Sequence, residues 1–205
     1  MEIFFFLIIL IFSIIIHEIA HGYMAEWFGD PTARLAGRLT LNPVPHIDPL
    51  GSIILPALML FGSGGTFAFG WAKPVPYNPY NLSNFKWGTI AVGLAGVLAN
   101  LALAVIFGLM LRFNAELGIT PGPFAEMLGT IVFLNIVLAV FNMIPFPPLD
   151  GAKVLFAFLP VRFQYIHDFL EQNWLFFIIF VIFFAQYIIW PISSFIFMGI
   201  TGVGL

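Results

Sequence analysis

Long apolar runs, separated by short polar or proline-rich stretches, set the pattern of this chain. A helix needs about 20 mostly apolar residues to cross a membrane, and four runs reach that length. These runs are Ile3–Phe28, Gly88–Arg112, Phe124–Ile144 and Trp174–Met198. The pattern therefore predicts an all-α polytopic membrane protein with about four spanning helices.

Three other stretches are too short or too polar to cross. Leu50–Phe61 equals only about 18 Å of helix and contains Pro56, which predicts a re-entrant or interfacial segment. Gly62–Pro79 is rich in glycine, proline and aromatic residues, which favours short extended segments. Val161–Asn173 mixes polar and apolar residues as a helix at the membrane surface does, although an ordinary connector fits it equally well.

Composition supports the membrane class. The chain is 61% hydrophobic and 8% charged, whereas a soluble domain has roughly 25% charged residues. Little of the 205 residues remains for an extramembrane domain, so we expect one membrane-embedded domain over residues 1–205. The net charge of −3 forms no basic patch, which argues against nucleic-acid binding. The N-terminus lacks the basic region and cleavage site of a removable leader, so we expect the first span to be retained.

Candidate chemistry appears at the end of the first apolar run, which reads His17-Glu18-Ile19-Ala20-His21. Helical positions four apart share a face, so both histidines can bind one zinc ion while Glu18 lies beside the reacting water. Because the chain has no cysteine, every ligand must offer nitrogen or oxygen. His17 lies about 21 Å along the helix from Ile3, within a hydrocarbon core of about 30 Å. A zinc hydrolase with its metal inside the membrane is the first hypothesis.

Catalytic zinc normally has three protein ligands, so a third must come from a span end or a loop. Asp150, in a proline-rich stretch, and Asp48 are the leading acids, and His46 with Asp48 forms a rival pair. If Leu50–Phe61 does not cross the membrane, His21 and Asp150 end on the same side. The residues alone leave these alternatives open.

Basic residues indicate which side this is, because cytoplasmic loops are enriched in lysine and arginine. The opposite loop, Phe113–Pro123, contains Glu116 and no base, and Arg112 at that boundary is the one exception. The bases on the His21 side are Arg34, Arg38, Lys73, Lys86, Lys153 and Arg162. We therefore expect a multi-pass protein of a prokaryotic plasma membrane, with its active site nearer the cytoplasmic face.

Four motifs together resemble the site-2 protease family of intramembrane zinc metalloproteases, peptidase family M50. They are the His17–His21 run, Ala95-Gly96-Val97-Leu98-Ala99-Asn100, Phe141-Asn142 and Leu149-Asp150-Gly151. The resemblance covers about the first three-quarters of the chain. It implies a shared catalytic core over about 1–159 and an additional C-terminal span over about 174–198. Val97 stands where the family pattern has proline.

The resemblance also implies roles for individual residues. One Zn²⁺ per chain is expected, held by His17, His21 and Asp150. Glu18 is expected to be the catalytic base, and Asn142 to face the reaction centre as a second catalytic residue. The implied activity is hydrolysis of peptide bonds within or near transmembrane segments.

Such a substrate presents a particular difficulty, because a helix hides its carbonyls in its own hydrogen bonds and must be unwound locally. The resemblance places an extended stretch at Gly70–Val75, and a backbone edge there can bind an unwound substrate by strand addition. Phe69, Gly70 and Ala72 are the predicted substrate-binding residues. The expected partners are a transmembrane protein or peptide substrate and the lipid bilayer.

Two other function classes stay open at this point, a non-proteolytic zinc carrier and a scaffold that binds membrane segments. A carrier needs access from both sides, whereas the ionisable groups here gather towards one face. A scaffold has no need of the complete His17–His21 motif. Of the remaining polar residues, His46 is expected to order its loop, and Asn100 and Asn135 to form interhelical hydrogen bonds.

Overall fold

The computed structural model of the chain describes residues 2–64, 70–114, 116, 118, 122–160 and 163–204. All the regular secondary structure in these residues is helical, which confirms the predicted all-α class. The helices longer than one turn are α1 (Glu2–Trp27), η2 (Pro49–Ile54), α3 (Leu55–Gly62), α4 (Phe85–Arg112), α5 (Pro123–Asn142), α6 (Asp150–Phe158), α7 (Gln164–Gln172) and α8 (Trp174–Thr201). Three single turns are α2 (Thr32–Leu35), η1 (Val44–His46) and η3 (Pro79–Asn81).

Three of the described helices, α1, α4 and α5, are long and apolar enough to cross a membrane. They coincide with the first three predicted spans. The helix α8 covers the predicted fourth span over 28 residues, and its described side chains form a shorter apolar stretch, Tyr187–Thr201. Whether α8 crosses the membrane stays a prediction.

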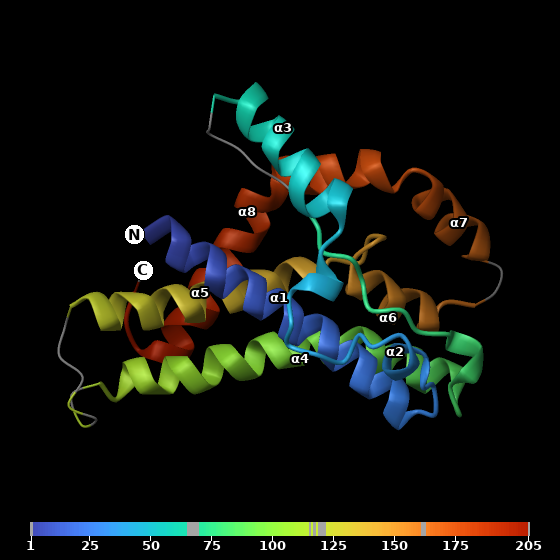
Figure 1. The fold of residues 1–205 in the computed structure, drawn as a ribbon, viewed down its shortest axis with the longest axis horizontal. Coiled ribbons are helices and arrows are strands. Elements are labelled where there is room, and N and C mark those ends of the chain that lie inside the picture. Colours follow the sequence, from blue (N-terminus) through green and yellow to red (C-terminus); the bar gives the residue numbers. More distant parts are fainter. Residues whose placement is uncertain are drawn as a thin grey trace.

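The helix α4 packs along both α1 and α5, and α5 also packs against α8 (Figure 1). A buried apolar cluster joins α4, α5 and α8 through Ala104, Val132, Ile136 and Phe197. The helix α4 runs without a break through Val97, the position at which the family pattern has proline. The helix α4 thereby contacts the three helices that carry the side chains of the site described below, α1, α5 and α6.

The predicted re-entrant segment forms two short helices, η2 and α3, which together cover Pro49–Gly62. Asp48 caps η2 by accepting a hydrogen bond from the N–H of Gly51 at 2.6 Å. At about 1.5 Å per residue the whole segment is shorter than the hydrocarbon core. Figure 1 shows α3 set apart from the bundle of α1, α4 and α5.

After this segment, the chain returns to the C-terminal end of α1, from which it had departed. Asp30, just beyond α1, is buried and accepts hydrogen bonds from Thr32, from the N–H of Asn78 and from the amide of Asn81. Burial raises the pKa of Asp30, but these hydrogen bonds together lower it by more than burial raises it. The pKa therefore lies below its ordinary value. The buried carboxylate therefore stays ionised and ties η3, the turn that precedes α4, to the end of α1.

These connections predict on which side of the membrane each loop lies. The native chain has no cysteine, so single cysteines can be labelled without background. We expect Ala36→Cys and Ser83→Cys to be labelled from one side and Glu116→Cys from the other, because the N–H of Ser83 bonds the carbonyl of Phe28 and α4 then runs to the opposite face. Membrane-impermeant maleimide labelling of oriented vesicles is the measurement. Labelling of Ala36→Cys and Ser83→Cys from opposite faces would make Pro49–Gly62 a true crossing.

Candidate metal centre

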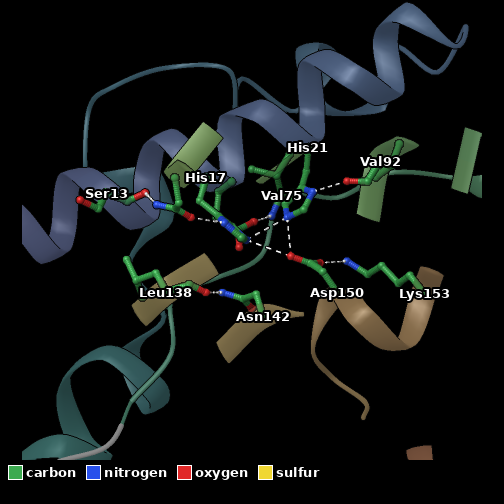
Figure 2. A network of polar contacts seen from close by, with 11 residues as sticks. Ser13, His17, His21, Val75, Val92, Leu138, Asn142, Asp150 and Lys153 are labelled. Carbon is green, nitrogen blue, oxygen red and sulfur yellow. Dashed lines mark hydrogen bonds and ion pairs between the residues drawn. The ribbon is translucent and has the colours of Figure 1, made fainter. Parts of the chain in front are cut away.

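His17 and His21 of α1 meet Asp150, the first residue of α6, in the interior of the protein (Figure 2). The Nε2 atoms of both histidines lie 3.0 Å from Oδ2 of Asp150 and 3.0 Å from each other. All three residues are buried, with no more than 6% of their surface exposed. Among the described residues, no other group of three histidine, aspartate or glutamate side chains comes together in this way.

The hydrogen bonds of the two rings decide where their protons are. Nδ1 of His17 lies 2.6 Å from the side-chain oxygen of Asn100, and Nδ1 of His21 lies 2.6 Å from the carbonyl oxygen of Val92. Both oxygens only accept, so each Nδ1 must carry a proton. In the neutral rings, each Nε2 then presents a lone pair to Oδ2 of Asp150, a buried oxygen that receives no hydrogen bond.

Three lone-pair donors thus converge on one point with no proton between them. Such an arrangement is repulsive in a buried site unless a cation lies at the centre. Two imidazole nitrogens and one carboxylate oxygen form a typical ligand set for catalytic zinc. Ligands at about 2.0–2.1 Å from a tetrahedral zinc ion lie about 3.3 Å apart, close to the spacing found here. The residues therefore fit a zinc ion.

Two glycines permit this close approach. A Cβ on Gly96 of α4 would lie 2.5–2.6 Å from three atoms of the His17 ring, so only glycine lets the ring rest on α4. A Cβ on Gly151 would lie 2.3 Å from the carbonyl oxygen of Met143. The start of α6 can therefore fold back tightly onto the end of α5, which brings Asp150 to the histidines.

Glu18 and Asn142 line the cavity next to these ligands, which has a volume of about 640 Å³. One carboxylate oxygen of Glu18 accepts a hydrogen bond from the N–H of Val75 at 2.7 Å. Asn142 donates one amide hydrogen to the carbonyl of Leu138 at 2.9 Å (Figure 2). The structure thus brings both predicted catalytic side chains to the same cavity as His17.

The stretch that follows α3 runs past the site without forming a helix. The N–H groups of Trp71 and Lys73 donate to the carbonyls of Gly51 and His46, at 3.1 and 2.9 Å. The carbonyls of Trp71 and Lys73 accept from Ser52 and Arg38, at 2.8 and 2.6 Å. Alternation of this kind is typical of an extended strand bonded along one edge. We call residues 70–75 the extended segment.

The second edge of the extended segment is open at Ala72. Within the described parts of the chain, no hydrogen bond reaches the N–H or carbonyl of Ala72. Ala72 and Gly70 line the cavity that also contains His17 and Glu18. The third predicted substrate-binding residue, Phe69, lies outside the described residues.

Comparison with known proteins places the chain in a family. It is 35% identical over 194 residues to "Putative zinc metalloprotease YwhC" of Bacillus subtilis, covering 91% of this chain and 84% of that protein. The chain belongs to the site-2 proteases, peptidase family M50. The sequence model of Peptidase family M50 matches residues 118–185. The protein is therefore a protease whose cofactor is zinc.

More distant relatives agree. "Putative zinc metalloprotease Rip2" of Mycolicibacterium smegmatis is 33% identical over 144 residues, which are 70% of this chain and 52% of that protein. "Zinc metalloprotease MJ0392" of Methanocaldococcus jannaschii is 24% identical over 159 residues, which are 78% of this chain and 35% of that protein. The site-2 protease thus spans 52% of the length of the Mycolicibacterium relative and 35% of the length of the archaeal one. No solved structure gives a significant match.

A buried polar chain behind the metal centre joins three helices of the protease. Asn100 of α4 donates to the side-chain oxygen of Asn135 on α5 at 2.8 Å and to the carbonyl of Ser13 on α1 at 3.3 Å. Asn135 in turn donates to the hydroxyl of Ser13 at 3.0 Å. The prediction that both asparagines form interhelical hydrogen bonds is confirmed. The contact of Asn100 with His17 was not predicted, although the asparagine ends a family motif.

The rival ligands predicted at His46 and Asp48 have other partners. Nε2 of His46 lies 2.9 Å from the carbonyl of Thr40, and its own carbonyl accepts from Lys73. Asp48 caps η2. His46 therefore orders its loop, as expected, and the histidine–aspartate pair stays apart from the predicted zinc ligands.

The two asparagines allow a matched test of how the polar chain acts. Both are fully buried, but only Asn100 bonds a predicted zinc ligand. We expect Asn100→Ala to weaken zinc binding by about 10- to 100-fold, as loss of a partner behind a metal ligand usually does. Asn135→Ala is expected to retain zinc much better, while both variants lose about 1–3 kcal/mol of stability. Chelator competition and thermal unfolding measure the two effects. Equal loss of zinc affinity in both variants would show that these buried hydrogen bonds affect zinc only through folding.

Proposed function

We propose that this site-2 protease hydrolyses peptide bonds within or near transmembrane segments of membrane proteins. The observation that carries the proposal is the position of the ligands. His17 lies about 21 Å along α1 from Ile3, in a helix apolar enough to span the membrane. The adjoining cavity contains both an acid and an open backbone edge. A protease centre at that depth favours substrates that are themselves in the membrane.

We propose His17, His21 and Asp150 as the three zinc ligands. Bound zinc supplies Lewis acidity, which makes water a stronger nucleophile and polarises a carbonyl oxygen. The chain's own contribution is orientation, because Asn100 and the carbonyl of Val92 hold the two rings with Nε2 towards the site.

Glu18 is the proposed general base. Its carboxylate follows His17 directly in sequence and lines the same cavity, and Val75 holds only one of its two oxygens. The other oxygen remains to accept a proton from water and to return it to the leaving amine.

Asn142 is the proposed second catalytic residue. The bond to Leu138 uses one of its two amide hydrogens, so the other remains to donate into the cavity. A donor placed there stabilises the negative oxygen that develops as the peptide bond is attacked.

Substrate binding is proposed at the open edge of the extended segment. A helix that unwinds in the membrane leaves N–H and carbonyl groups that need new partners. Ala72 offers one donor and one acceptor beside the proposed catalytic cavity, and Gly70 lines the same cavity. Strand addition at this edge would both satisfy the unwound substrate and place its backbone in the cavity that Glu18 lines.

We propose that the end of α1 near His21 faces the cytoplasm of a prokaryotic cell, and that residues 1–205 act as one membrane-embedded domain. This end of the protein carries Arg34, Arg38, Lys73 and Lys86, as the positive-inside rule requires. Maleimide labelling of Ala36→Cys and Ser83→Cys in intact cells tests this orientation.

The proposed activity is tested by Glu18→Gln. We expect the variant to keep bound zinc and to lose cleavage of a single-span substrate, because the ligands and the acceptor for Val75 remain while the proton acceptor is lost. Metal content and mapped cleavage products are measured on one preparation, with a chelated wild-type sample as control. Wild-type cleavage by the zinc-loaded variant would remove Glu18 from its role. Absence of cleavage by the zinc-loaded wild type, across a panel of spans, would favour a carrier or scaffold.

The open edge is tested by Ala72→Pro, with Ala72→Val as its matched control. Proline removes the N–H of residue 72 and favours extended backbone at Trp71, whereas valine adds bulk and keeps the N–H. We expect the proline variant to cleave a transmembrane substrate at least about tenfold more slowly, corresponding to about 1.4 kcal/mol, with zinc and stability unchanged. Equal rates for stable proline and valine variants would contradict strand addition.

A further inference from the structure

Asp150 has a second charged partner besides the histidines. Nζ of Lys153, one helical turn later in α6, lies 2.8 Å from Oδ1 of Asp150 (Figure 2). The two histidines approach the other oxygen, Oδ2, at 3.0 Å each. The two carboxylate oxygens therefore have different partners: Oδ1 bonds an ammonium group, and Oδ2 is directed into the metal centre.

The lysine is held in this position from several sides. Its stem lies against α4 at Gly93, where an added Cβ would be only 3.3 Å from Cβ of Lys153. Its ammonium nitrogen lies 5.8 Å from the centre of the Tyr77 ring, which contributes a further attraction for a cation. The side chain is one-third exposed (33%), so solvent reaches part of it while the contact with Asp150 remains buried on the carboxylate side.

We propose that Lys153 is a positioning residue of the zinc centre, which occupies Oδ1 of Asp150 and so presents Oδ2 alone to the metal. An aspartate that binds through one oxygen leaves room in the coordination sphere for water, which a catalytic zinc site requires. A carboxylate free to rotate would lose this fixed direction or use both oxygens. The inference rests on the proposed role of Asp150 as zinc ligand.

A matched control is available in Lys86. Its ammonium nitrogen lies 5.0 Å from the centre of the Phe158 ring, at the far end of α6. No described carboxylate forms an ion pair with it. Lys86→Met therefore removes a lysine that contacts an aromatic ring of the same helix pair without touching the metal centre.

The experiment uses the full chain in detergent or lipid nanodiscs. Lys153→Met, Lys153→Gln, Lys153→Arg, Lys86→Met and Asp150→Ala are compared with the wild type for zinc affinity by chelator competition. The visible absorption spectrum of the Co²⁺-loaded protein reports the ligand geometry. We expect folded neutral variants at Lys153 to bind zinc about 10- to 100-fold more weakly with a changed Co²⁺ spectrum. Lys153→Arg should restore both properties, and Lys86→Met should leave both unchanged.

The outcomes separate this inference from the ligand assignment. Wild-type zinc affinity and Co²⁺ spectrum in a folded neutral Lys153 variant, together with loss of zinc in Asp150→Ala, would overturn the role of Lys153 alone. Retention of zinc by Asp150→Ala would overturn the ligand assignment on which it rests. If both neutral variants fail to fold while Lys153→Arg folds with weak zinc binding and a changed Co²⁺ spectrum, the inference is also rejected, since the charge then serves folding.

Discussion

The structure depends on the convergence of three electron-pair donors, from His17, His21 and Asp150, in the buried interior, where water screens charges only weakly. Each is fixed by a second contact, so none can turn away from the others. The arrangement is favourable only around a cation, and a zinc ion held as proposed would supply that charge. The proposal therefore implies that the folding of the surrounding helices and the binding of the metal are coupled.

The helix α4 provides most of the framework for this convergence. Gly93, Gly96 and Asn100 recur at spacings of three and four residues and so share one face of the helix. One glycine accommodates α6, the next accommodates the ring of His17, and the asparagine bonds that ring. A single helical stripe thus sets how closely α1 and α6 approach each other, and with it the spacing of the proposed zinc ligands.

Sequence reasoning succeeded where local pattern carries the information. The apolar runs located α1, α4 and α5, and the spacing of His17 and His21 indicated zinc. For the third ligand, the residues alone left Asp48 beside Asp150, and the family resemblance favoured Asp150. The hydrogen bond from Val75 to Glu18 joins residues far apart in the chain, so no local pattern predicts it. The contact of Asn100 with His17 likewise depends on how α1 and α4 approach each other.

The extended segment links the proposed base to the proposed substrate edge. Val75 bonds Glu18, while Ala72, three residues earlier, leaves its donor and acceptor open to the cavity. Pro74 and Pro76 have no N–H, and in an extended segment these positions face the same way as Ala72. The open edge is therefore limited to a very short stretch, which guards it against pairing with other strands. A substrate bound there as proposed needs to unwind over only a short stretch, so the loss of its helical hydrogen bonds stays small and falls in the cavity that the proposed base lines.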